Sequence, residues 1–151
     1  MSVTLSKTPI APGALLDGFC ANRSETGAVA SFTGLVRAEQ GVTQALEPES
    51  YEGFAEKQIE AMVASAVERF SLQDALVVHR IGRIGPGEAV RIIAAAAPHR
   101  KAALEACDHL TDYLKSRAPF WKKEHGPDGE RWIEPTIADH QDAARWDEAT
   151  K

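Results

Sequence analysis

The 151-residue chain contains little cysteine and no long apolar run. Cys20 and Cys107 belong to no C-x-x-C pair and to no metal-ligand spacing. Cys107 falls on an apolar helical stripe, which favours a small core residue over a nucleophile, and two unpatterned cysteines are typical of a reducing compartment. The longest apolar stretch, residues 92–97, is too short to span a bilayer, and the N-terminus does not look like a signal peptide. We therefore expect a cytoplasmic protein.

Several catalytic motifs are also missing from the sequence. No glycine-rich segment has the spacing of a P-loop or of a dinucleotide-binding loop, and no serine stands in a G-x-S-x-G elbow. The five histidines show no metal-binding spacing with carboxylates. We expect neither a metal nor another bound cofactor.

Charge is distributed unevenly along the chain. The hydrophobic content of 44% and the charged content of 26% are ordinary for one globular domain, and the net charge of −5 disfavours binding to nucleic acid or to a membrane by bulk electrostatics. Residues 99–124 nevertheless carry six Lys or Arg against four Asp or Glu. A local cationic site on an acidic body fits a small anionic ligand better than a polymer.

Apolar periodicity and turn residues predict an α+β fold with a mixed sheet. A short helix should open at Pro12-Gly13, and two longer ones should include residues 59–70 and 99–117, the second ended by Pro119. Strands are expected at residues 3–5, 27–37, 45–51, 75–81 and 89–97. Gly34 indicates a bulge or a close backbone approach, and Pro48 restricts its strand to an edge or a bulge.

The C-terminal part should contain a hairpin whose turn lies at residues 126–129, between strands at 120–124 and 131–134. Residues 38–44 are expected to form a mobile loop. We predict a single catalytic domain over residues 1–135, followed by a polar tail over residues 136–151 that is only partly ordered.

The segment 113–124 is the most distinctive part of the chain. It combines the end of a helix, Pro119, and the aromatic pair Phe120-Trp121 next to lysines. Cations held against aromatic side chains indicate a pocket for an anion with an apolar or ring-shaped body; a basic edge strand is the alternative. Lys115 is either a favourable charge at a helix C-terminus or a partly desolvated lysine whose lowered pKa suits acid–base or nucleophilic chemistry.

His99 and Arg100 stand at a strand-to-helix junction, where free backbone N–H groups favour an anion. The alternative is a solvated junction without a ligand. Arg100 and Lys115 are fifteen positions apart, which places them about 22 Å apart on a continuous helix. If both serve one site, that site must be shared across a two-fold dimer; otherwise there are two sites, or one of the residues has no role.

Four segments together resemble the large, catalytic subunit of molybdopterin synthase. They are Ser31-Phe32-Thr33-Gly34-Leu35-Val36-Arg37, His79-Arg80-Ile81-Gly82, His99-Arg100 and the segment 113–124, and the likeness covers residues 27–132 in order and spacing. The resemblance implies an α/β hammerhead-type fold and a homodimer that binds two small ubiquitin-like sulfur carriers, giving a heterotetramer. The C-terminal Gly-Gly thiocarboxylate of each carrier would enter the pocket. Two sulfurs would then pass to cyclic pyranopterin monophosphate to form the molybdopterin dithiolene.

The same resemblance suggests roles for individual residues. Lys115 and Lys122 match the catalytic lysines of the family by position, and Arg37 matches its pocket arginine. His99 and Arg100 match the residues that bind the substrate phosphate from the other protomer. The neighbours expected to line the same pocket are Leu35, Val36, Lys123 and Glu124.

Two other functions are compatible with the same basic residues. A non-catalytic, anion-binding adaptor domain would keep the pocket without turning over a substrate. An unrelated lysine enzyme would form a Schiff base with a carbonyl compound. The resemblance favours the sulfurtransferase over both.

Overall fold

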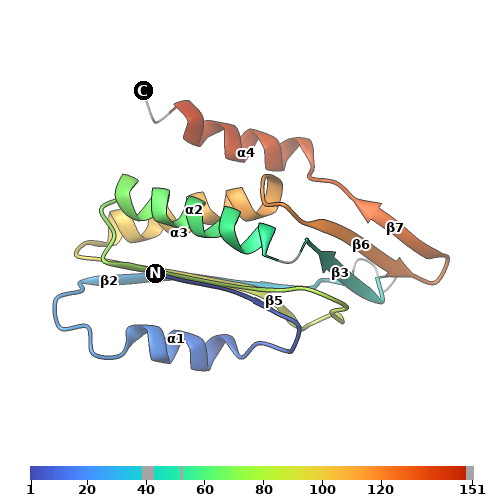
Figure 1. The fold of residues 1–151 in the computed structure, drawn as a ribbon, viewed down its shortest axis with the longest axis horizontal. Helices are drawn as coiled ribbons and strands as arrows, with labels where there is room; N and C mark the ends of the chain where they lie inside the picture. The colour runs from blue at the N-terminus through green and yellow to red at the C-terminus, as the bar shows by residue number, and fades with distance from the viewer. Residues whose placement is uncertain (39–42, 52, 149–151) are drawn as a thin grey trace.

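The structure, a computed structural model, describes residues 1–38, 43–51 and 53–148 (Figure 1). The centre of the predicted loop at 38–44 therefore lies outside the described residues. No helix in the described ranges is long and apolar enough to cross a membrane. The elements along the chain are β1 (Ser2–Ser6), α1 (Pro12–Cys20), β2 (Ala28–Leu35), β3 (Ala45–Glu49), α2 (Phe54–Arg69), β4 (Asp74–Arg80), β5 (Ala89–Ala97), α3 (Arg100–Ser116), β6 (Trp121–Gly126), β7 (Gly129–Ile133) and α4 (Ile137–Glu148).

A four-stranded mixed sheet forms the body of the molecule, with the strand order β1-β4-β5-β2. β1 runs parallel to β4, and the other neighbouring pairs are antiparallel. Helix α1 covers one face, and helices α2 and α3 cover the other (Figure 1). Because side chains alternate along a strand, Ile93 of β5 packs into the core under α2 and α3, whereas Ile92 packs into the core on the α1 side.

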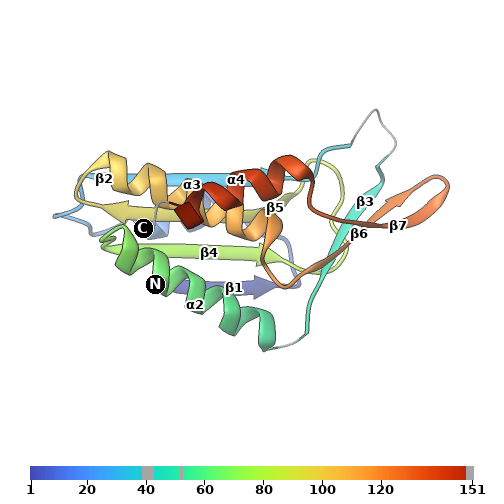
Figure 2. The ribbon, with the colours of Figure 1, turned by 90° about the horizontal axis from the view of Figure 1, so that it is seen from above.

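A second, three-stranded sheet with the order β3-β6-β7 extends from one end of the first (Figures 1 and 2). Strands β6 and β7 form the predicted hairpin, in which Gly126 pairs with Gly129. Pro48 lies in β3, an outer strand of this sheet, as expected of a residue without a backbone N–H donor. The α+β class and the two long helices are confirmed, but the strands divide between two sheets rather than one.

Helix α4 was not predicted from the sequence, which suggested a partly ordered tail from residue 136. Its start is fixed by a reciprocal pair of hydrogen bonds. The Thr136 N–H donates to Asp139 Oδ2 at 2.8 Å, and the Asp139 N–H donates to Thr136 Oγ1 at 3.1 Å. This arrangement is a capping box with Asp in place of Glu or Gln. The polar composition was misleading because most of the helix surface faces solvent.

Trp146 attaches α4 to the rest of the molecule. Its ring lies edge-on to Phe70 at 5.8 Å and to His109 at 5.1 Å, measured between ring centroids. Its indole Nε1 donates to Asp112 Oδ2 at 2.6 Å. One aromatic side chain therefore joins α4 to α3 and to the residue that follows α2, and its polar atom is satisfied.

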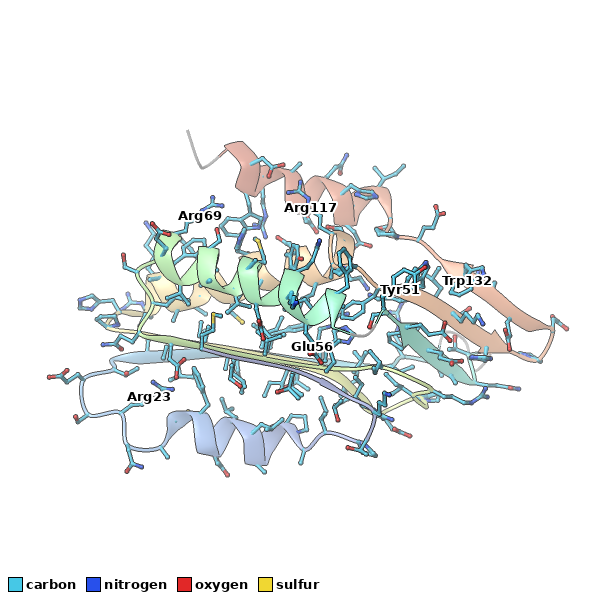
Figure 3. The ribbon with its side chains drawn as sticks, viewed as in Figure 1. Arg23, Tyr51, Glu56, Arg69, Arg117 and Trp132 are labelled. Atoms are coloured by element: carbon cyan, nitrogen blue, oxygen red, sulfur yellow. The ribbon has the colours of Figure 1, made fainter. Side chains whose placement is uncertain are left out.

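Two arginines hold the C-terminal turn of α4, and both lie between this helix and the layer below it (Figure 3). Arg69 donates to the backbone carbonyl of Trp146 at 2.8 Å. Arg117 makes two hydrogen bonds to the Asp147 carboxylate, at 2.9 and 2.7 Å. The first contact satisfies a carbonyl that has no partner within the helix.

We expect Trp146→Ala to lower the free energy of unfolding by about 2–3 kcal/mol, because the substitution removes a large, half-buried aromatic contact. Ile137→Ala is the matched control on the same helix. Ile137 is 78% exposed, so its loss should change stability by less than about 0.5 kcal/mol. Urea denaturation of both variants measures the difference, and equal stabilities would contradict the docking role of Trp146.

Candidate active site

A cavity of about 770 Å³ lies between the C-terminal end of α3, the end of β2, the start of β5, and the small sheet. Thr136 and Asp139, at the start of α4, form part of its wall. Most of the site residues predicted from the sequence line this cavity: Leu35, Val36, Arg37, Lys115, Lys122 and Glu124.

Lys123 does not line the cavity, and its predicted place there is wrong. Its ammonium lies 3.7 Å from Glu130 Oε2 and 4.8 Å from the centre of the Trp132 ring, on the other face of the small sheet. Adjacent residues of a strand point to opposite faces. The inward position of Lys122 in β6 therefore places Lys123 outward.

His99 and Arg100 also lie away from the cavity. Both are exposed at the N-terminal end of α3, whereas Lys115 stands in its last turn. The 17-residue helix separates its two ends by about 24 Å. Within one chain, neither residue can share a small ligand with Lys115, so their role in a pocket of a second protomer stays a prediction.

Lys122 is the partly desolvated lysine of the site. Burial of its ammonium, reinforced by the charges of Arg91 and Lys115, lowers the pKa of Lys122 to about 7. The carboxylate of Asp139 acts in the opposite direction. A lysine with this pKa is present in both protonation states near neutral pH, so it can accept and release a proton.

Lys115 differs from Lys122 in its exposure. It stands in the last turn of α3 with its side chain exposed, and it also lines the cavity. The desolvation that the sequence analysis considered for Lys115 is found at Lys122 instead. The charge of Lys115 nevertheless acts on the cavity, because it contributes to lowering the pKa values of both Lys122 and Asp139.

Arg91 was missed by the sequence analysis, although it is the one charged residue in the apolar strand β5. Its side chain lines the cavity and is only 6% exposed. Burial lowers the pKa of Arg91 to about 10, so the guanidinium remains charged at neutral pH. A lone arginine inside an otherwise apolar strand was the signal that could have identified it.

Asp139 was also missed, and the signal that could have found it is the capping box at the start of α4. Burial acts to raise its pKa, but hydrogen bonds from Thr136 and the charges of Lys115 and Lys122 outweigh this effect and lower it. Asp139 is therefore an ionised carboxylate next to the two lysines.

His79, from a segment that the sequence analysis singled out, lies beneath the cavity. Its ring stacks on Phe120, which lines the cavity, with 4.3 Å between the ring centroids. Burial, together with the charges of Arg91 and Lys122, holds the pKa of His79 well below its usual value. The ring is therefore neutral and supports the aromatic wall without adding charge.

Glu124 contributes little free negative charge, because it is bound at the rim of the cavity. Its carboxylate accepts hydrogen bonds from Arg131 Nε at 2.8 Å and from Thr43 Oγ1 at 3.3 Å. Leu35, which is 59% exposed, adds an apolar edge.

Proteins of known sequence and structure identify the family of this chain. The sequence profile described as "MoaE protein" matches residues 5–117. The chain belongs to the MoaE family. A molybdopterin synthase catalytic subunit from Caulobacter vibrioides is 61% identical over 148 residues, covering 98% of this chain and 99% of that protein.

Solved structures of MoaE-family proteins have the same fold. A molybdopterin biosynthesis MoaE protein from Burkholderia ambifaria is 37% identical and superposes with a TM-score of 0.81, covering 96% of this chain and 97% of that one. A molybdopterin synthase structure from Staphylococcus aureus is 33% identical, with a TM-score of 0.76 over 85% of this chain and 94% of that one.

In this MoaE-family chain, the cavity combines excess positive charge with an apolar wall. Five cations line it, namely Arg37, Arg91, Lys115, Lys122 and Arg131, against the three carboxylates of Glu124, Glu134 and Asp139. Among these carboxylates, Asp139 is the one that raises the pKa of Lys122. Apolar surface comes from Leu35, Leu114 and Phe120. Such a cavity suits an anion with an apolar or ring-shaped body, as the segment 113–124 indicated.

We expect Arg91→Met to raise the pKa of Lys122 by about one unit or more, because the substitution removes the second-largest cause of the lowered value. NMR titration of 13C-labelled lysine side chains measures this value, with the Lys122 signal assigned by its loss in Lys122→Arg. Arg83→Met is the matched control, since this exposed arginine does not line the cavity. An unchanged Lys122 pKa in Arg91→Met would show that the two charges do not interact.

Proposed function

We propose that this chain is the catalytic subunit of a molybdopterin synthase, and that it transfers sulfur inside the cavity during molybdenum cofactor biosynthesis. The observation that carries this proposal is the pKa of Lys122, which burial and neighbouring positive charges in the cavity lower to about 7. Membership in the MoaE family and the 61% identity to a molybdopterin synthase catalytic subunit support the same function.

The proposed reaction passes two sulfurs from a thiocarboxylated carrier subunit to cyclic pyranopterin monophosphate. Both reactants are anionic, and a cavity of about 770 Å³ falls within the usual range of about 300–1,000 Å³ for small-molecule sites. Neither cysteine of this chain lines the cavity. Burial raises the pKa of the Cys107 thiol to about 11, which makes it a poor nucleophile. A sulfur donor from outside the chain fits these properties.

The two lysines have different proposed roles. Lys122 exchanges a proton with the oxygen that leaves the pterin carbon as sulfur replaces it, because its pKa lies close to neutral pH. Lys115, exposed at the rim of the cavity, stabilises negative charge as it develops during the transfer. Arg37 adds positive charge at the same rim.

We expect Lys122→Ala to lower the rate of dithiolene formation about 10²–10⁴-fold, since it removes the proposed acid–base group. Lys123→Ala is the matched control: it deletes the adjacent lysine, which points away from the cavity, and should keep most of the activity. Purified protein is mixed with thiocarboxylated carrier and the cyclic pterin, and the dithiolene product is quantified. Wild-type rates in Lys122→Ala would contradict the assignment.

The same reconstitution separates the sulfurtransferase from the other two functions. An adaptor domain would give no dithiolene even with the wild-type chain and thiocarboxylated carrier. A Schiff-base enzyme would become covalently labelled on Lys115 when borohydride is added with a carbonyl substrate.

We further propose that the active unit is a homodimer with a small carrier bound to each protomer. His99 and Arg100 are exposed at the end of α3 opposite the cavity, so they can contribute only to a cavity in another copy of the chain. In that arrangement they bind the phosphate of the substrate, and Lys115 and Lys122 come from the partner.

Mixing Lys115→Ala and Arg100→Ala chains tests the shared site. Each variant alone should be inactive, whereas a heterodimer regains one intact cavity. Statistical mixing should therefore restore about a quarter of the wild-type activity per chain. The dithiolene assay reads this out after the chains are unfolded and refolded together. Mixtures that stay inactive although both chains pair would exclude a shared site.

A further inference from the structure

Among the described residues, Arg91 stands out because it presents buried hydrogen-bond donors without an acceptor. The residue lies near the start of β5, paired with Gly34 of β2 on one side and with His79 of β4 on the other. Its side chain lines the cavity at 6% exposure. Nε and Nη1 of its guanidinium are buried, and within the described part of the chain neither donates a hydrogen bond.

Three carboxylates line the cavity, those of Glu124, Glu134 and Asp139, and no hydrogen bond among the described residues joins any of them to Arg91. Asp139 accepts a hydrogen bond from the N–H of Thr136, and Glu124 accepts one from Arg131. Asp139 attracts Arg91 through its charge, but no hydrogen bond joins the two among the described residues. A buried guanidinium in this condition is unfavourable unless an anion completes its hydrogen bonds.

The backbone around Arg91 leaves room for its side chain. A Cβ atom added to Gly34 would lie 3.2 Å from Arg91 Nε and 3.3 Å from a methyl carbon of Val90. The register of β2 against β5 also shifts between Gly34 and Leu35. A larger residue at position 34 would press on the guanidinium, so the glycine and the bulge together fix its place at the inner end of the cavity.

A planar guanidinium matches a carboxylate-like group, which it can bind through two parallel hydrogen bonds. The group must also be slender, because Arg91 is nearly inaccessible while Lys115 and Leu35 are exposed at the rim. A chain end made of two glycines has no side chains and meets this requirement. A phosphate attached to a rigid pterin ring system meets it less well.

We propose that Arg91 binds the terminal carboxylate or thiocarboxylate of the carrier subunit and positions it at the inner end of the cavity. This inference rests on the proposed function, because it requires a carrier that ends in Gly-Gly. Arg91 then acts as a binding residue for the sulfur donor, apart from the positive charges at the rim.

Calorimetric titration with two forms of the carrier tests this assignment. One form ends in the Gly-Gly carboxylate, and the other carries a terminal amide. The wild-type chain should bind the carboxylate form about tenfold or more tightly, because a charge-assisted hydrogen bond is lost with the amide. Arg91→Met should remove this preference while its affinity for the amide form stays unchanged, which also shows that the variant is folded.

Two further variants complete the comparison. Arg83→Met deletes an exposed arginine outside the cavity and should keep the wild-type preference. Arg91→Lys retains a positive charge but loses the planar donor set, so it should keep only part of the preference. It also provides a second measurement if Arg91→Met does not fold.

The possible results lead to different conclusions. Equal binding of both carrier forms by the wild type, or an unchanged preference in Arg91→Met and Arg91→Lys, would overturn the role of Arg91 alone. An Arg91-dependent affinity for inorganic phosphate, without an Arg91-dependent carboxylate preference, would assign the residue to the pterin phosphate instead. Failure of the wild type to bind either carrier form would overturn the proposed function together with this inference.

Discussion

Positive charge removed from water is the feature on which this site depends. Lys122 and Arg91 are held in a cavity between two sheets, where burial disfavours the charged form of each and the charge of Arg91 further lowers the pKa of Lys122. The lysine responds by losing affinity for its proton, while the guanidinium remains charged because its pKa falls only to about 10. The cavity thus contains a proton-exchanging group next to a permanent cation.

The fold creates this arrangement by joining two sheets at one end of α3. The large sheet supplies Arg91 from β5, the small sheet supplies Lys122 from β6, and α3 brings Lys115 to the opening. Because none of the three elements is next to another in a continuous sheet, the cavity can remain open between them. His79 and Phe120 stack beneath it and give the charged groups a rigid, apolar support.

Helix α4 both stabilises the fold, through its packing on α3, and forms part of the cavity wall. Trp146 fastens the helix over α3 and Phe70, and the capping box at the opposite end places Asp139 against the two lysines. The carboxylate moderates the charge of the cavity, since it raises the pKa of Lys122 against the effect of Arg91. The C-terminal segment, whose composition resembles that of a polar tail, therefore supplies the cavity with part of its wall and with a negative charge.

The sequence determined the α+β class, the order of most elements and the importance of segment 113–124, because apolar periodicity, prolines and glycines act locally. It also located Lys115 and Lys122, through a run of residues specific enough to resemble one family. Only the tertiary structure decided that Lys122 is the desolvated lysine, that Lys123 points outward, and that Arg91 and Asp139 belong to the site. Those properties depend on the packing of two sheets and a helix distant in sequence, and burial and charge proximity are set by that packing rather than by neighbouring residues in the chain.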